Sequence, residues 1–335
     1  MKRNIALLYG GMKDEHEVSV SGFGYVKKLI ESSGNASLPI YVSRSGEWRV
    51  TDSDGEHTAL ASPEVGGSIR LDNGRLIHVD AAIPLLHGVG GESGEIQGAL
   101  KTASIPFVGA DTVTGGVCLD KHYTKCVAQS LGIPVTKWVC FSEKTNTATA
   151  LGICREKIGY PMFIKPRRLG SSVGAHPVYG EDDFSVFFPK SMEAGSNLVI
   201  VEELIDNKRE LECAFYSALG VTNFSAPGEI LTDGFYGYSE KYEKQTKTTP
   251  KASVDIETLK RLDTYNRLLA STLSLRHLAR IDYFLRDGKV IFNEVNTFPG
   301  FTEHSLYPKL LSEMGIDPSA AISAFVEDAI VARTL

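Results

Sequence analysis

Cysteines are few in this sequence and follow no pattern that would give them a structural role. The five cysteines are odd in number and include no Cys-x-x-Cys pair, so neither a disulfide framework nor a zinc site is expected. Long apolar runs are also missing, and the opening stretch NIALLYGG is too short for the core of a signal peptide. We therefore expect reduced thiols, a cytoplasmic location and no membrane partner.

Positive charge is not in excess either. The chain has 35 Lys and Arg residues against 41 Asp and Glu residues, a net charge of -6. Nonspecific binding to nucleic acid needs a surplus of basic residues, so no nucleic-acid partner is expected and any phosphate site must be local. The sequence contains no Gly-x4-Gly-Lys-Ser/Thr motif, which excludes a Walker-type phosphate loop.

Apolar residues, by contrast, are sufficient for several cores. A chain of 335 residues with 42% hydrophobic content predicts two or three domains. In the first third, strand-like runs alternate with helix-like stretches, which predicts an α/β unit with a parallel sheet. The strands are expected at 5–9, 38–42 and 81–86, with a helix that begins after Ser19 or Ser21.

Turn residues clustered at 109–116 predict a boundary after this unit. From Met162 onward the segments are rich in strand formers and hairpin turns, and a leucine pattern predicts a helix over 256–273. We expect three domains: a substrate-binding α/β domain, a central domain with a glycine-serine loop, and a C-terminal domain. Their predicted bounds are 1–112, 113–200 and 201–335.

The stretch HGVGGESG, residues 87–94, leads from a predicted strand to a predicted helix. Its glycines allow the backbone to approach a ligand closely at a helix N-terminus. As a dinucleotide fingerprint it fails, because Ser93 replaces the third glycine and Glu92 would lie near the pyrophosphate. A nicotinamide-dependent enzyme is therefore a minor alternative.

The most informative glycine-rich loop is KPRRLGSSVG, residues 165–174. It follows a predicted strand and returns into another strand rather than a helix, which is typical of a flap over phosphates. Its glycines turn backbone N–H groups toward a ligand, Ser171 and Ser172 add hydroxyl donors, and Lys165 adds a cation. A plain surface hairpin is the alternative.

Polar residues interrupt the apolar hairpin ARIDYFLRDGKVIFNEVNTFPG, residues 279–300. Arg280 and Asp282 share one face of the first strand, and Glu294 and Asn296 share one face of the second. A three-residue turn at 286–288 would bring both pairs to the same face, with Glu294 opposite Arg280 and Phe292 opposite Asp282. A two-residue turn would separate them.

Buried ionised groups need a partner or a metal. Asp282, Glu294 and the Asn296 amide are hard oxygen ligands suited to Mg²⁺ or Mn²⁺ shared with phosphates. The alternative is a cross-strand salt bridge between Arg280 and Glu294, with Asp282 exposed.

The order of these features resembles the ATP-grasp fold: Lys165, the glycine-serine loop, VEEL at 201–204, Glu210, and then the polar hairpin. Eight segments in sequence are similar to D-alanine:D-alanine ligases, namely YGGMKDEHEVSVS, LLHGVGGESGEIQGAL, DKHYTK, FIKPRRLGSSVG, APGEI, FYGYSEKY, ARIDYFL and NEVNTFPGFTEHSLYPKL. The resemblance implies mixed α/β and α+β architecture, an ATP-grasp fold behind an N-terminal α/β domain.

The resemblance also implies an activity. Members of this family join two D-alanine molecules for peptidoglycan precursors, using ATP and two Mg²⁺ or Mn²⁺ ions, and are usually homodimers. For ATP the implied residues are Glu202 and the Glu203 and Leu204 backbone at adenine, Glu210 at ribose, and Lys121, Lys165, Lys241 and Ser172 at the phosphates. For Lys121, near a predicted helix start, a solvated side chain is the alternative.

The amino-acid substrates have implied residues as well. Glu15 would bind the ammonium of the first D-alanine, His87 would lie near its carboxylate, and Ser171 and Tyr242 would hydrogen-bond with Glu15. Arg280 and the Gly300 N–H would stabilise the tetrahedral oxyanion, and Ser305 and Leu306 would meet the second substrate. Ser93 departs from the family, which usually has Asp there, and this puts any polar contact of that side chain in doubt.

The resemblance alone does not specify the second substrate, because related ligases join D-alanine to D-serine or D-lactate. Residues 232–250 are expected to form a lid; they contain Tyr242 and no histidine, which disfavours D-lactate. Leu306 offers no polar partner to the hydroxyl of D-serine. An ATP-binding protein without catalytic activity is the alternative from another functional class.

Overall fold

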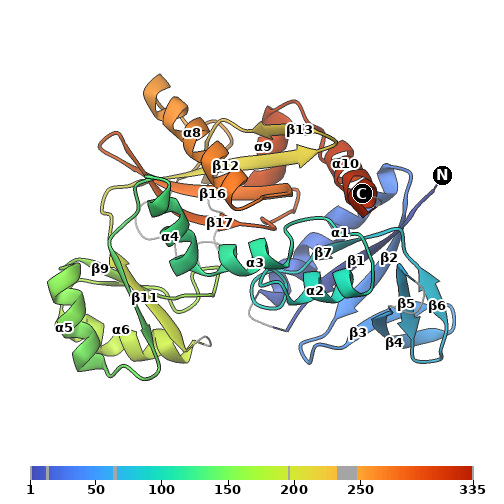
Figure 1. The fold of residues 1–335 in the computed structure, drawn as a ribbon, viewed down its shortest axis with the longest axis horizontal. Coiled ribbons are helices and arrows are strands. Elements are labelled where there is room, and N and C mark those ends of the chain that lie inside the picture. Colours follow the sequence, from blue (N-terminus) through green and yellow to red (C-terminus); the bar gives the residue numbers. More distant parts are fainter. Residues whose placement is uncertain (1, 13–14, 63–65, 195–196, 232–246, 334–335) are drawn as a thin grey trace.

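The computed structural model describes residues 2–12, 15–62, 66–194, 197–231 and 247–333. Three units follow one another along the chain, each built around its own sheet (Figure 1). Tyr242 and Lys241 lie outside the described residues, as does most of the predicted lid. Within the described part of the chain, no helix is long and apolar enough to cross a bilayer.

The N-terminal unit has a seven-stranded sheet in the order β6-β5-β4-β3-β2-β1-β7. Its strands are β1 Asn4–Gly10, β2 Ala36–Val42, β3 Trp48–Asp52, β4 Gly55–Ser62, β5 Ser68–Leu71, β6 Leu76–His78 and β7 Ala81–Leu85. The predicted parallel sheet is confirmed for β1, β2 and β7. The other four strands form an antiparallel extension that the sequence analysis did not predict.

Helix α1, His16–Ser32, begins earlier than predicted. Neither predicted serine caps it. Ser19 instead lies inside the helix, where its hydroxyl accepts a hydrogen bond from the Gly10 N–H and donates one to the Leu85 carbonyl. The helix start is thereby tied to the ends of β1 and β7, the edge where the site lies.

The central unit has a four-stranded antiparallel sheet in the order β10-β9-β11-β8. From Thr112 onward the turn cluster predicted at 109–116 is helical, because Asp111 caps α3 by accepting from the Thr114 N–H at 2.8 Å. The elements from α2 onward are α2 Glu95–Thr102, α3 Thr112–Leu119, α4 Lys121–Ser130, β8 Trp138–Ser142, α5 Thr147–Lys157, β9 Met162–Pro166, β10 His176–Val178, α6 Glu181–Glu193 and β11 Leu198–Glu203.

The C-terminal unit contains a six-stranded sheet, β15-β14-β12-β16-β17, with β13 paired to β12. Helix α8 agrees with the predicted helix over 256–273 to within one residue. Lys247–Thr249, inside the predicted lid, form strand β15. The elements are β12 Arg209–Ala218, β13 Val221–Phe224, β14 Gly228–Leu231, β15 Lys247–Thr249, α8 Ile256–Thr272, β16 His277–Arg286, β17 Lys289–Asn296, α9 Leu306–Glu313 and α10 Pro318–Arg333.

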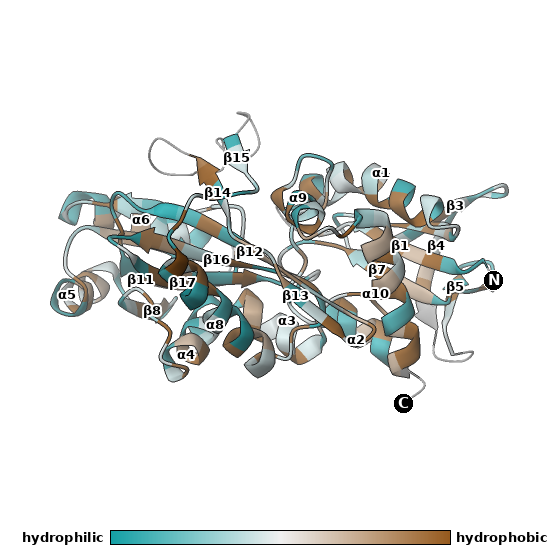
Figure 2. Ribbon diagram, turned by 90° about the horizontal axis from the view of Figure 1, so that it is seen from above, coloured by the Kyte–Doolittle hydropathy of each residue, from teal (hydrophilic) through white to brown (hydrophobic). Residues whose placement is uncertain are grey.

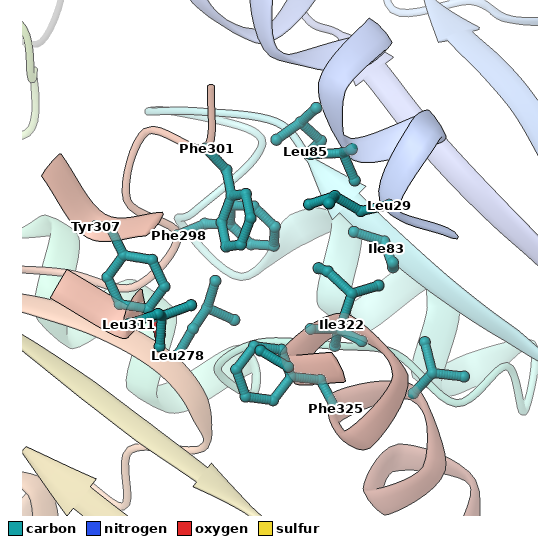
Figure 3. Close-up of a cluster of buried hydrophobic side chains, with 14 of the residues drawn as sticks. Leu29, Ile83, Leu85, Leu278, Phe298, Phe301, Tyr307, Leu311, Ile322 and Phe325 are labelled. Atoms are coloured by element: carbon teal, nitrogen blue, oxygen red, sulfur yellow. The ribbon is translucent and has the colours of Figure 1, made fainter. Parts of the chain in front are cut away.

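The first and last parts of the chain share one hydrophobic core. Much of α10 is hydrophobic, and it packs against β7 (Figure 2). Ile322 and Phe325 of α10 and Leu278 of β16 lie in one cluster with Ile83 of β7 (Figure 3). This core fixes the position of β16 and the segment after β17 relative to the N-terminal sheet, and the site lies along that junction.

Candidate active site

A pocket lies between the central and C-terminal sheets. It takes cations from α4 and β9, carboxylates from β11 and β17, and the glycine-serine loop. Its lining residues include Lys121, Phe163, Lys165, Gly170, Ser171, Ser172, Glu202, Leu204, Ile205, Glu210, Phe284 and Glu294. Predicted phosphate and adenine residues are therefore brought together in one pocket.

The polar hairpin reaches a shared face by a different route from the predicted one. Its turn has two residues, Asp287 and Gly288, both with positive φ (49° and 70°), the geometry of a tight hairpin turn. The predicted three-residue turn and its cross-strand pairs are therefore wrong. A β-bulge at Asn293 shifts the register by one residue and sets Glu294 opposite Asp282.

Arg280 is the centre of this polar face. Its guanidinium donates to both oxygens of Asp282, Nε to Oδ1 at 2.8 Å and Nη2 to Oδ2 at 2.7 Å, and lies 3.1 Å from Glu212 Oε2. Asn296 Nδ2 also donates to Asp282 at 2.9 Å. Asp282 is only 9% exposed, so the alternative with an exposed Asp282 is wrong.

The electrostatics of this face favour a fixed positive charge. Burial alone would lower the pKa of Arg280, but the charges of Asp282 and Glu212 outweigh it and raise that pKa well above its usual value. Glu212 was not predicted to take part. Its signal was the alternation Glu210, Glu212 in the strand RELECAF, which sets two carboxylates on one face.

The donor set fits Mg²⁺ or Mn²⁺ only with oxygens from another source. Asp282, Glu294 and the Asn296 amide oxygen supply hard ligands, yet no cluster of three or more His, Cys, Asp or Glu residues within the described ranges could hold a metal alone. Ions that retain several outer ligands and bind phosphate oxygens match such a partial set.

Lys121 is buried rather than solvated, so the alternative proposed for it is wrong. It is 7% exposed, donates to the Leu169 carbonyl at 2.6 Å and lies 3.5 Å from Glu294 Oε2. The preceding Asp120 caps α4 and binds Arg167 and Arg168 at the base of the glycine-serine loop. Helix start and loop are thus fixed together.

Glu15 links the N-terminal unit to the loop. Ser171 Oγ donates to Glu15 Oε1 at 2.7 Å, the contact that the sequence analysis expected. Two glycines make room for this carboxylate, since a Cβ at Gly170 would lie 2.7 Å from Glu15 Oε1 and one at Gly88 would lie 2.1 Å from Oε2. Glu15, which was predicted to bind the first substrate, therefore contacts the glycine-serine loop directly.

The part of the pocket that was predicted to bind adenine contains a buried carboxylate between two lysines. Glu202 is 2% exposed, with Lys165 Nζ 3.2 Å from Oε2 and Lys125 Nζ 3.4 Å from Oε1. Burial would raise the pKa of Glu202, but these lysines lower it overall. Lys125, which the sequence analysis did not single out, is as buried as the apolar core.

The backbone beside Glu202 revises one expectation. The Leu204 N–H donates to the Pro161 carbonyl at 3.1 Å and the Glu203 N–H to the Lys137 carbonyl at 3.0 Å. Neither amide is therefore available to a ligand. Ile205 is the next residue that lines the pocket. On the ribose side, Glu210 lies 3.3 Å from Lys208, whose ammonium is 4.1 Å from the Phe284 ring centre.

Glu92 and His87 fix the segment that follows β17. Glu92 Oε1 accepts from the Phe298 N–H at 2.9 Å and from Thr297 Oγ1 at 3.2 Å, and Oε2 accepts from the Gly88 N–H at 3.0 Å. His87 Nδ1 lies 3.1 Å from the Phe298 carbonyl. Burial raises the pKa of Glu92 despite the nearby His87. The sequence analysis had considered Glu92 only as an obstacle to pyrophosphate.

Gly300 and the second-substrate residues lie just beyond this segment. A Cβ at Gly300 would lie 3.3 Å from Ser305 Oγ, and that hydroxyl accepts from the Thr302 N–H at 3.0 Å. Leu306 is buried. Ser93 accepts a hydrogen bond from the Gly90 N–H at 2.7 Å and contacts Glu95, so it makes polar contacts of its own.

Two family models cover most of the chain. The D-ala D-ala ligase N-terminus matches residues 4–110, and the D-ala D-ala ligase C-terminus matches residues 127–327. The chain belongs to the D-alanine–D-alanine ligase family. The recognised resemblance, the ligase class and the ATP-grasp fold are thereby confirmed.

Individual family members resemble the whole chain. D-alanine–D-alanine ligase A of Escherichia coli (strain K12) is 32% identical, with 98% of this chain and 96% of that protein covered. D-alanyl-alanine synthetase A from Vibrio cholerae has a TM-score of 0.88 at 29% identity, covering 98% of this chain and 99% of the other. The VanG D-Ala:D-Ser ligase from Enterococcus faecalis has a TM-score of 0.87 at 32% identity, covering 98% and 100%.

The partial metal site gives a first prediction. Glu294→Ala and Asn296→Ala should leave the fold intact but abolish turnover, because bound phosphates would lose their counter-charge and no core contact is removed. Circular dichroism should match the wild type, and phosphate release should vanish at Mg²⁺ concentrations that saturate the wild type. Normal activity in Glu294→Ala would show that this residue holds no metal.

The hydrogen bond between Glu92 and the Phe298 N–H gives a second prediction. Glu92→Gln should lower kcat about tenfold, because an amide that accepts from Phe298 turns its NH₂ toward the Gly88 N–H and leaves that donor unsatisfied. Glu95→Gln, an exposed change at the first residue of α2, is the control. Equal kcat values for the two variants in steady-state assays would remove Glu92 from the positioning of this segment.

Proposed function

We propose that this protein joins two D-alanine molecules into D-alanyl-D-alanine while ATP is converted to ADP and phosphate. The family supports the reaction class. The observation that carries the proposal is the meeting of three parts at one site: Glu15 bonded to the phosphate loop, the oxygen ligands of the hairpin, and the loop held by Glu92.

In the first step, the carboxylate of one D-alanine attacks the γ-phosphorus, which forms an acyl phosphate and releases ADP. Lys121 and Lys165 offset phosphate charge, and Ser172 donates from the loop. Glu15 binds the substrate ammonium, and His87, held at its Nδ1 by the Phe298 carbonyl, lies near the substrate carboxylate. Phosphoryl transfer needs mainly this positioning and charge neutralisation.

The charge balance of the pocket supports a requirement for divalent ions. The cations Lys121, Lys125, Lys165 and Arg280 are matched by the carboxylates Glu202, Glu212, Asp282 and Glu294. A triphosphate would therefore enter a network with no surplus positive charge. We propose that Asp282, Glu294 and Asn296 hold two Mg²⁺ or Mn²⁺ ions, which would neutralise the phosphates when bound.

In the second step, the amine of the other D-alanine attacks the acyl carbon, and phosphate leaves from the tetrahedral intermediate. Arg280 and the Gly300 N–H stabilise its oxyanion. The bidentate pair with Asp282 keeps the guanidinium in a fixed orientation. Ser305 and Leu306 contact the second substrate, and Tyr242 and Lys241 complete the site from outside the described residues.

The adenine lies between apolar residues such as Phe163 and Phe284, and polar groups recognise the base and its ribose. Glu202 accepts a hydrogen bond from the exocyclic amine, and Glu210 binds the ribose. Because the Leu204 N–H is occupied by Pro161, we assign the backbone donor to Ile205 instead.

The cellular setting is part of the proposal. The product would serve peptidoglycan precursors, and we place the reaction in the cytoplasm. We also propose a homodimer, the usual state in this family.

Substitution of the oxyanion arginine gives a third prediction. Arg280→Lys keeps the charge but loses the planar fork that binds Asp282. Turnover should fall by roughly two orders of magnitude, the scale of one lost oxyanion donor, while KM for ATP changes little. Wild-type turnover in this variant would exclude Arg280 from oxyanion stabilisation.

D-serine is an alternative to D-alanine as the second substrate. Similarity to the VanG D-Ala:D-Ser ligase favours D-serine as the second candidate. Leu306 provides no partner for its hydroxyl, yet an apolar pocket rejects an added hydroxyl by only about a hundredfold.

We therefore expect D-alanyl-D-alanine as the main product when D-alanine, D-serine and D-lactate compete at pH 7. Phosphate release with and without each amino acid, ATP and Mg²⁺, followed by mass spectrometry of the products, measures this directly. A depsipeptide or D-alanyl-D-serine as the main product would contradict the assignment. If D-alanine does not stimulate phosphate release, the result would favour a protein that binds nucleotide without catalysing ligation.

A further inference from the structure

Lys125 is a charged side chain with no exposure to solvent. It lies on α4 with 0% of the residue exposed, and its Nζ donates to Thr136 Oγ1 at 2.7 Å. The same nitrogen lies 3.4 Å from Glu202 Oε1 and 5.8 Å from the ring centre of Trp138. Burial of a lysine is costly unless it is paired, so this position calls for a reason beyond packing.

Glu202 would not need this lysine for charge compensation alone, since Lys165 already lies 3.2 Å from its other oxygen. Lys165, however, lines the pocket and is assigned to the phosphates. If Lys165 were the sole counter-charge of Glu202, its ammonium would be drawn away from the nucleotide. Lys125 contacts Glu202 from the side away from the pocket, since it is not among the residues that line the pocket in the described chain.

Glu202 Oε1 is the atom on which this arrangement acts. It is buried, and apart from the Lys125 ammonium 3.4 Å away it has no hydrogen-bond partner among the described residues, although Glu202 lines the pocket. Thr136 Oγ1 lies 3.4 Å from the other oxygen, Oε2, so the same hydroxyl contacts both Lys125 and Glu202. An ionised carboxylate with one open acceptor selects a ligand that presents a donor, and repels one that presents a carbonyl.

We propose that Lys125 is a positioning residue for base recognition: it keeps Glu202 ionised and oriented so that Oε1 accepts from the 6-amino group of adenine. The inference rests on the proposed Glu202–adenine contact. Lys125 thereby sets the preference for ATP over purine nucleotides that lack this amine, without touching the nucleotide. Burial, which lowers the pKa of Lys125 to about 8 against the opposing charge of Glu202, agrees with a tightly enclosed pair.

The test compares ATP with purine riboside 5′-triphosphate, which lacks the amine, and with GTP. In Lys125→Met, KM for ATP should rise at least tenfold, while kcat stays within about threefold. KM for purine riboside triphosphate should stay within twofold of the wild type. The ratio of the two KM values, which measures the preference for the 6-amino group, should therefore fall. Lys157→Met, an exposed change on α5 in the same unit, should leave all three KM values unaltered.

Other variants keep the result interpretable. If Lys125→Met does not fold, Thr136→Val removes the hydroxyl that holds Lys125 and should produce the same amine-dependent loss at smaller scale. Equal KM increases for ATP and purine riboside triphosphate would mean a structural role and would overturn the inference. Glu202→Gln distinguishes the role of Lys125 from the Glu202–adenine contact on which it rests. Amine-dependent loss in Glu202→Gln but not in Lys125→Met overturns only the role of Lys125, whereas no such loss in Glu202→Gln overturns the adenine contact and this inference together.

Discussion

The constraint on which this structure depends is that charges removed from water must be matched in place. Arg280 is enclosed by Asp282 and Glu212, Glu202 lies between two lysines, and Lys121 lies beside Glu294. Each group on its own would be costly to bury. The Arg280 pairs form within the C-terminal sheet and the Glu202 pairs form within the central unit. The Lys121–Glu294 pair joins the two units, so it forms only when they are assembled.

This charge matching also explains how the site can be stable without a ligand and still bind a triphosphate. A network whose internal charges cancel can exist before nucleotide arrives, yet it offers little net attraction to a triphosphate. In the proposed reaction, affinity for the phosphates comes from cations that enter with them, and from backbone and hydroxyl donors of the glycine-serine loop. Ser171 and Ser172 both have positive φ, 54° and 58°, a costly backbone geometry for serine. Its bond to Glu15 helps to hold Ser171 in that geometry.

Much of the site could be predicted from the sequence because its residues lie in short, ordered motifs. The alternation in ARIDYFL and NEVNTF indicated which side chains share a face, and KPRRLGSSVG indicated a flap between strands. What the sequence could not show was register. The turn was predicted with three residues, and the bulge at Asn293 supplied the one-residue shift instead. A bulge leaves no reliable mark in a single sequence, because any residue type can occupy it.

Three residues that contact and position the predicted site residues were not predicted, for a related reason. Lys125, Glu212 and Glu92 carry ordinary charged side chains on helix, strand and loop, and a local pattern predicts such residues to be exposed. Their burial results from tertiary contacts, as does the position of α10 against β7. The antiparallel extension β3–β6 was likewise not predicted, since its polar strands show little apolar alternation.

The connection between Asn296 and Gly300 shows how this assembly serves two steps of one reaction. The proposed metal ligand Asn296 and the proposed oxyanion donor Gly300 are separated by only three residues. The middle of these, Phe298, is held through both its N–H and its carbonyl by the N-terminal loop. A shift of that loop would therefore move Asn296 and Gly300, and with them the two roles proposed for these residues, together. The His87–Glu92 loop also borders the carboxylate of Glu15, which Gly88 accommodates. In the proposed reaction, the groups that bind the first substrate, the metal and the oxyanion are thus mechanically linked. This favours transfer of the acyl group to the second amine, with loss of phosphate, before water can reach the acyl phosphate.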